Sequence, residues 1–272
     1  TTVPTTTTVP TTTTVPTTTT GATTTTGPGP TSPHATTPGA ACVKPANEVV
    51  QGAVVSMATV SVLVAPATDG GDGSQCAGYW VVTRSGDVAA FGSAVAYGSL
   101  EGTHLNAPIV GIAPTPDYGG YWLVASDGEV FTFGDATLYG SMGGAHLNAP
   151  IVGVAAAPTG GGYWLVASDG GVFGFGDATY HGSMGDADLD SPVVGFTTTP
   201  NGSGYRMVDG DGNIFSFGAT FYGSFGADRP PAPISAVAPS ADGKGYYLVD
   251  ASGEVYVYGD APYLGSAASQ GA

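Results

Sequence analysis

The chain has 272 residues, of which 10% are charged, and its 21 acidic side chains against 5 basic ones give a formal net charge of −16. Nucleic acids and anionic membranes are bound through clusters of Lys and Arg, so this charge excludes both as expected partners. With 45 glycines, 21 prolines and no stretch of 18 apolar residues, the sequence offers few helix-forming runs and no membrane insertion. Composition therefore predicts an all-β domain with a low-complexity appendage.

Residues 1–40 form a low-complexity tail of Thr, Pro, Val and Gly, which opens with the motif TTVPTT repeated every six residues. Such a segment cannot bury a core, and its prolines favour an extended or polyproline II backbone. Tracts of Thr and Pro are also typical of O-glycosylated stalks, so the tail is interpreted either as a flexible spacer or as a glycosylated stalk. The candidate O-glycosylation sites are Thr5, Thr6, Thr7, Thr8, Thr11, Thr12, Thr13 and Thr14.

Residues 41–59 are a junction between the tail and the rest of the chain. The two cysteines, Cys42 and Cys76, flank the segment that leads into the repeats. An even number of cysteines in a chain of extracellular character favours a disulfide over a metal site. We therefore expect a disulfide between them, which would tie the base of the tail to the first repeat.

The remainder of the chain, 60–272, contains five copies of one repeat, with spacings of 42, 42, 42 and 41 residues between equivalent tyrosines. The copy at 120–135, GYWLVASDGEVFTFGD, predicts two short strands joined by Asp-Gly, a strong hairpin signal because both turn residues adopt positive φ. Both faces of this hairpin are apolar, so a single hairpin cannot cover itself. The equivalent tyrosines are Tyr79, Tyr121, Tyr163, Tyr205 and Tyr246.

Each copy continues through a Gly-Ser pair, a polar loop and a Pro-led apolar strand such as 150–155, which makes four predicted strands per copy. A period near 40 residues with four strands is typical of a β-propeller blade. We therefore predict an all-β fold over 60–272, a five-bladed β-propeller of four-stranded blades preceded by an extended Thr/Pro-rich tail. A parallel solenoid with the same period is the alternative.

The start of the first blade is less well marked than the later ones. Residues 61–66 (SVLVAP) align with 110–114 (VGIAP) and are predicted to be its innermost strand. Upstream, 49–55 loosely resembles the outer-strand segment 137–142. This stretch is therefore either a strand that closes its own propeller or an extra strand that pairs with a neighbouring molecule.

The repeat resembles tandem sequences of the type GYWLVASDGGVFxFGDA…GS…LNAPVVGxAxTP, which occur in secreted and cell-surface proteins of actinobacteria. The resemblance is carried by 162–173 and 147–153 and covers about 190 residues. It implies a secreted β-propeller and no defined activity. The fourth and fifth copies depart from the pattern, with Arg206 and Tyr247 in place of the Trp.

One face of the predicted propeller carries repeated polar residues, because hairpin turns and the loops between blades emerge on the same side. Their oxygen and imidazole groups are suited to a cation or to sugar hydroxyls. Asp-Gly is also what a tight turn requires, and Asn-Ala-Pro is common in loops, so a purely structural role is the alternative. The candidate ligand face comprises Asp127, Asp169, His104, Asn106, His146 and Asn148.

Catalysis is not expected, because the four histidines form no His-Cys, Glu-His or Gly-x-Ser-x-Gly arrangement that would pair a nucleophile with a base. We also expect no metal and no cofactor. Two classes of extracellular function remain. The chain is either a structural subunit of a cell-surface or filamentous assembly, self-associating through the glycosylated tail, or a lectin-like propeller displayed on a stalk.

Overall fold

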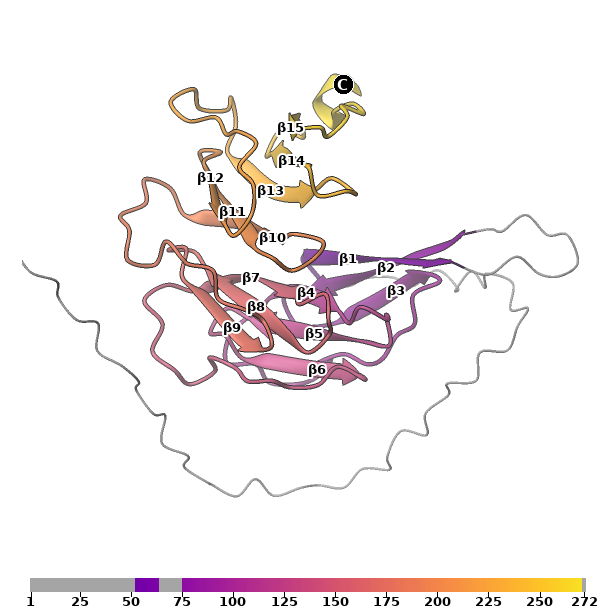
Figure 1. Cartoon of the computed structure of the whole chain (residues 1–272). Helices are drawn as coiled ribbons and strands as arrows, with labels where there is room; N and C mark the ends of the chain where they lie inside the picture. The colour runs from indigo at the N-terminus through magenta and orange to yellow at the C-terminus, as the bar shows by residue number, and fades with distance from the viewer. Residues whose placement is uncertain (1–51, 64–74, 271–272) are drawn as a thin grey trace, which may run out of the picture. The chain divides into compact units, whose positions relative to one another are not determined.

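A computed structural model describes residues 52–63 and 75–270 of the chain (Figure 1). The tail 1–40 with its candidate glycosylation sites, Cys42 and residues 49–51 lie outside these ranges. The predictions made for the tail and for the disulfide therefore stay predictions.

The described residues form five antiparallel sheets of three strands each, an all-β arrangement consistent with a five-bladed β-propeller. Each sheet consists of three strands consecutive in the chain, so the repeat in the sequence is also the repeat in the structure. The strands are β1 (Val54–Leu63), β2 (Gln75–Thr83), β3 (Val88–Gly92), β4 (Ile109–Pro114), β5 (Gly120–Ala125), β6 (Val130–Gly134), β7 (Ile151–Ala156), β8 (Gly162–Ala167), β9 (Val172–Gly176), β10 (Val193–Thr198), β11 (Tyr205–Asp209), β12 (Ile214–Phe217), β13 (Ile234–Pro239), β14 (Gly245–Asp250) and β15 (Val255–Gly259), followed by the short 3-10 helix η1 (Ala267–Gln270). Among the described residues, no helix is long and apolar enough to cross a membrane.

The hairpin predicted in each repeat is confirmed, but the expectation that both residues of the Asp-Gly pair adopt positive φ is wrong, because only the glycine does. In the second sheet, β5 and β6 pair so that Tyr121 lies opposite Phe133 and Val124 opposite Val130. The connecting turn places Gly128 at φ +82°, a left-handed conformation that glycine adopts without a steric penalty. Its N–H donates to the carbonyl of Ala125 at 2.9 Å, which closes the turn.

The fourth strand predicted for each repeat is not formed, because the segment after the third strand does not pair with it. In the second repeat, the carbonyl of Thr137 accepts a hydrogen bond from the Trp122 indole at 2.8 Å, and that of Gly140 accepts one from the Tyr163 hydroxyl. Side chains from the segment's own sheet and from the following sheet thus bind backbone carbonyls that this segment would need to pair as a fourth strand. The segment joins two sheets instead of widening one.

The first sheet begins earlier than the sequence alignment suggested. Ala58 lies opposite Trp80 in the same way that Ala113 lies opposite Trp122, so residues 54–59 and not 61–66 take the place of the innermost strand. Val54 belongs to this strand as well, and not to a separate outer strand. Residues 60–63 pair with 75–78 and extend the β1–β2 hairpin beyond the other sheets, as Figure 1 shows.

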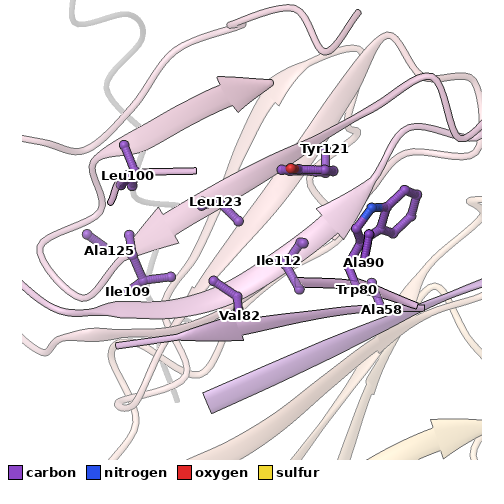
Figure 2. Close-up of a cluster of buried hydrophobic side chains, with 10 residues drawn as sticks. All are labelled: Ala58, Trp80, Val82, Ala90, Leu100, Ile109, Ile112, Tyr121, Leu123 and Ala125. Atoms are coloured by element: carbon purple, nitrogen blue, oxygen red, sulfur yellow. The ribbon is translucent and has the colours of Figure 1, made fainter. Parts of the chain in front are cut away.

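Four hydrophobic clusters form the core, and each lies between two consecutive sheets. In the first, drawn in Figure 2, Trp80 and Val82 of β2 pack against Tyr121 and Leu123 of β5. The innermost strands accordingly contact one another in sequence, β1 with β4, β4 with β7, β7 with β10 and β10 with β13. Within the described part of the chain, β13 and β1 make no contact of comparable extent, so the first and last sheets do not meet there as a closed propeller ring requires.

Candidate functional site

The two aspartates of the predicted ligand face hold the hairpin turns. Oδ1 of Asp127 accepts the N–H of Glu129 at 3.1 Å, and Oδ1 of Asp169 accepts that of Gly171 at 2.9 Å. A side-chain oxygen that binds the backbone two residues on is the geometry of an Asx turn. Asp127 and Asp169 therefore both stabilise their turns, which is the structural role that the sequence analysis gave as the alternative to ligand binding.

The loops expected beside these turns do lie at the same edge of the sheets. The Ser126 N–H donates to the carbonyl of Pro108 at 2.9 Å, and its carbonyl accepts the N–H of Ile151 at 2.9 Å. The four loop residues of the predicted face are exposed to solvent: His104, Asn106, His146 and Asn148.

No hydrogen bond or ion pair joins any two of the six predicted ligand-face residues, all of which are described. Across 52–63 and 75–270, moreover, no three His, Cys, Asp or Glu side chains gather as metal ligands would. The structure brings the turns and loops to one edge but does not assemble these six side chains into a site.

The repeated tryptophans are buried. Trp80, Trp122 and Trp164 are at most 1% exposed, and their indole N–H groups donate to the carbonyls of Val95, Thr137 and Thr179 at 2.8–2.9 Å. Rings held in this way cannot stack on a sugar. They fill the space between sheets, as aromatic side chains in a repeated core usually do.

Arg206 replaces this tryptophan in the fourth sheet and takes over its contacts. Its Nε donates to the carbonyl of Thr220 at 3.0 Å, as the indole does in other sheets. Its guanidinium carbon lies 5.3 Å and 5.4 Å from the ring centroids of Tyr222 and Tyr246, within cation–π range. Nη1 is buried and has no hydrogen-bond partner among the described residues. Arg206 therefore packs at the position that tryptophan occupies in three other sheets, but it places a positive charge between the sheets.

Two grooves, each of about 320 Å³, open between adjacent sheets at the edge opposite the Asp-Gly turns. The groove between the second and third sheets is lined chiefly by Thr115, Asp117, Trp122, Asp135, Tyr139 and Thr159. The groove between the fourth and fifth sheets is lined by equivalent positions, among them Thr199, Ser203, Arg206, Thr220, Tyr222 and Asp242.

Hydroxyl and carboxylate groups face each other in the first groove. The Thr115 hydroxyl donates to Oδ1 of Asp135 at 3.2 Å. The hydroxyl of Thr159, on the other wall, donates at 2.6 Å to Oδ2 of Asp177, which is not part of the groove lining. Burial and the neighbouring Asp117 raise the pKa of Asp135, whereas the pKa of Asp117 is lowered by hydrogen bonding from Thr115 and from the Gly119 N–H. Such a set of donors and acceptors is suited to polar ligands such as sugars.

Sequence reasoning did not find these grooves, because their walls come from two successive repeats. Asp135 belongs to one repeat and Thr159 to the next, so neither stands out as part of a motif. The available signal was the recurring Phe-Gly-Asp-Ala turn, whose aspartates are Asp135 and Asp177. In the fourth repeat Ala219 follows the Phe-Gly pair, so the two grooves are not chemically equivalent.

From the second sheet to the fifth, the repeated tyrosine of the middle strand joins its sheet to the preceding one. The Tyr205 hydroxyl donates to the carbonyl of Gly182 at 2.6 Å and accepts the N–H of His181 at 3.0 Å. Burial raises the pKa of this hydroxyl above its ordinary value of 10.0. The same bond to a glycine carbonyl is made by Tyr121, Tyr163 and Tyr246.

No protein-family model and no curated protein matches the chain. Among solved structures, it is similar to the β-propeller domain of Myceliophteria thermophila Cps50 (Swd1), with a TM-score of 0.42 and 12% sequence identity. The match covers 70% of this chain and 64% of that chain, so this chain spans less than two thirds of that domain's length. The resemblance to secreted actinobacterial repeat proteins stays a prediction.

Proposed function

We propose that this chain is a non-enzymatic extracellular structural protein, a β-propeller repeat domain that serves as a subunit of a cell-surface or filamentous assembly. The proposal rests on one observation, the structural role of the side chains that recur in the repeats. The Tyr residues that recur in the units, and the Trp and Asp residues that recur in three of the five, are engaged in core packing, sheet-to-sheet hydrogen bonds and turns. These roles in building the sheets support a structural function for the repeat.

The Thr-rich tail is proposed to connect copies. Its six-residue period places successive Val-Pro pairs on one side of either an extended or a polyproline II backbone. Ordering a residue costs roughly 1–2 kcal/mol, so an ordered tail needs many contacts or a dense sheath of attached glycans. Its threonines supply the hydroxyls to which such glycans are attached.

A deletion of 1–40 tests this role of the tail. Electron microscopy and light scattering should show assemblies for the full chain and their loss for the truncated chain. A matched control replaces 1–40 by a Gly/Ser segment with the same number of residues, which keeps the contour length but removes Thr and Pro, and should also fail to assemble. Unchanged filaments from the truncated chain would overturn the connecting role.

A lectin-like module is the second candidate, and the two grooves favour it. Each has a volume suited to a few sugar hydroxyls and is lined by Thr hydroxyls and carboxylates. Glycan-array binding followed by titration calorimetry tests it. Binding that is lost in Asp135→Asn and kept in the exposed variant Asp186→Asn would support the lectin, whereas no binding across the array counts against it.

A further inference from the structure

Each sheet presents two different faces to its neighbours. We call the side that contacts the preceding sheet the leading face and the side that contacts the following sheet the trailing face. In the second sheet, Tyr121 and Leu123 belong to the leading face and pack on the first sheet, whereas Trp122 and Val124 belong to the trailing face and pack on the third. Every junction thus joins one trailing face to one leading face.

The same three contacts recur at the four junctions between consecutive sheets. The leading-face tyrosine donates to a glycine carbonyl in the segment that leaves the preceding sheet, as Tyr205 does to Gly182. The residue before that glycine lies against the tyrosine ring, with His181 and Tyr205 5.5 Å apart. An aromatic ring of the leading face then covers the glycine, and Phe217 is so close that a Cβ on Gly182 would lie 2.5 Å from it.

The leading face of the first sheet makes no extensive contact with another sheet in the described part of the chain, and it is exposed at its edges, while Val81 and Ala89 on the same face are buried. Met57 is 59% exposed, whereas Ile112 at the equivalent place in the second sheet is 6% exposed. Tyr79 is 40% exposed and stacks on Phe91 at 5.0 Å, whereas the four equivalent tyrosines are fully buried. Among the described residues, the Tyr79 hydroxyl makes no bond to a glycine carbonyl of the kind the others make.

The fifth sheet displays the complementary trailing face. Ala236 and Ala238 of β13 are exposed, and Tyr247, at the place of the buried tryptophans, is partly exposed. Leu264 precedes the glycine of the junction and is 85% exposed. A Cβ on Gly265 would meet nothing within 4 Å, in contrast to the crowded equivalents in the other repeats.

We propose that the trailing face of the fifth sheet binds the leading face of the first sheet of a second copy, so that the chain associates head to tail. The interface continues the four junctions already present, with Leu264 on Tyr79, the Tyr79 hydroxyl bound to the Gly265 carbonyl and Phe91 over Gly265. Within the described residues, β13 and β1 of one copy make no such contact, so neither end face is covered by the other end of the same chain. A contact between two different faces builds a ring or a filament and not a two-fold dimer.

This inference rests on the self-association in the proposed function, but it assigns the contact to the sheets and not to the tail. Analytical ultracentrifugation of the full chain should show association that strengthens with concentration. Leu264→Glu places a charge in the interface and should weaken association at least tenfold. Leu138→Glu is the matched control, because Leu138 is 55% exposed but lies in the second repeat, away from both end faces, and should leave association unchanged.

Disulfide trapping shows which copies touch. Full chains carrying Tyr79→Cys are mixed with full chains carrying Leu264→Cys and oxidised, and the unsubstituted chain reports any cross-linking by Cys42 and Cys76. A cross-linked pair above that background, absent when Leu138→Cys replaces Leu264→Cys, is expected. A chain carrying both substitutions that cross-links only to itself, or a protein that stays monomeric at every concentration, would overturn the proposal.

The deletion of 1–40, measured in parallel, separates this inference from the proposed function. Association that survives the deletion but is lost in Leu264→Glu supports the sheet contact and removes the connecting role of the tail. Association that is lost on deletion and unaffected by Leu264→Glu leaves the structural function standing and removes the head-to-tail contact.

Discussion

The hydroxyl of Tyr205 in the fourth sheet donates to the carbonyl of Gly182, in the segment that leaves the third sheet, at 2.6 Å. This bond crosses the boundary between two repeats and recurs at three other boundaries. It couples each sheet to the next through one side chain. In repeat proteins, contacts between neighbouring units contribute to stability, and we expect this bond to be one such contribution.

Tyr205→Phe tests this coupling. Removal of the hydroxyl leaves the Gly182 carbonyl without its donor and should lower the free energy of unfolding by about 1–2 kcal/mol in a urea titration. Tyr79→Phe is the control, since Tyr79 makes no equivalent bond within the described chain, and in dilute solution it should cost little. Equal losses for both variants would contradict the account.

Gly140→Ala tests the close approach of neighbouring sheets. A Cβ there would lie 2.5 Å from Phe175, whereas one on Gly265 would meet nothing within 4 Å. Both glycines have positive φ, so the backbone strain of alanine is shared and the difference reports the contact. Gly140→Ala should therefore unfold at clearly lower urea concentration than Gly265→Ala. The reverse order would contradict the assigned packing.

Arg206→Trp should stabilise the protein by about 1 kcal/mol, because it removes a buried Nη1 without a partner and restores an indole that can donate to Thr220. Arg206→Leu fills part of the same space but cannot donate, so it should be less stable than the Trp variant. Chemical denaturation of the three proteins measures the order. A Trp variant less stable than Arg206→Leu would show that the fourth sheet does not accept the ring.

Asp250 should make the fifth sheet sensitive to acid. Its carboxylate accepts hydrogen bonds from the backbone and hydroxyl of Ser252 at 2.8 and 2.6 Å, from the Glu254 N–H at 3.0 Å and from the Tyr256 hydroxyl at 2.9 Å. Burial opposes ionisation, but these bonds hold the pKa of Asp250 below its ordinary value of 3.8. Because the folded pKa is the lower one, the carboxylate stabilises the fold above pH 3.8 and loses that contribution as the pH falls through the folded pKa.

Asp250→Asn should accordingly be about 2 kcal/mol less stable than the parent at pH 7, and the difference should shrink as the pH falls below 3.8 toward the folded pKa. Urea midpoints measured across this range test the sign. The exposed Asp186→Asn serves as the control and should follow the parent at every pH. A difference that grew on acidification would contradict the assigned hydrogen bonds.

The hairpins, their period and the all-β class could be predicted from the sequence because their signals are local. Asp-Gly between apolar runs defines a turn wherever it occurs, and the Tyr-Trp pair repeats at an almost constant spacing. The missing fourth strand could not be predicted, because the Gly140 carbonyl is taken by Tyr163 of the next repeat. That choice depends on packing between units.

The start of the first strand and the positions of the possible binding surfaces also depend on contacts between segments that are far apart in the sequence. The start of β1 was misplaced because 54–59 and 61–66 are both short apolar stretches, and only pairing with Trp80 distinguishes them. The turns and loops of the candidate ligand face share one edge, as predicted, but no motif indicates whether Asp127 binds its own turn or a ligand. The grooves at the opposite edge combine residues from two repeats and carried no compact signal.

The most direct test of the account is a cryo-electron microscopy structure of the self-associated full chain, resolved well enough to place the Tyr79 side chain. The account predicts that Tyr79 of one copy lies buried against Leu264 of the next, with its hydroxyl bound to the Gly265 carbonyl. A Tyr79 that stays exposed, or that binds Gly265 of its own chain, would contradict it.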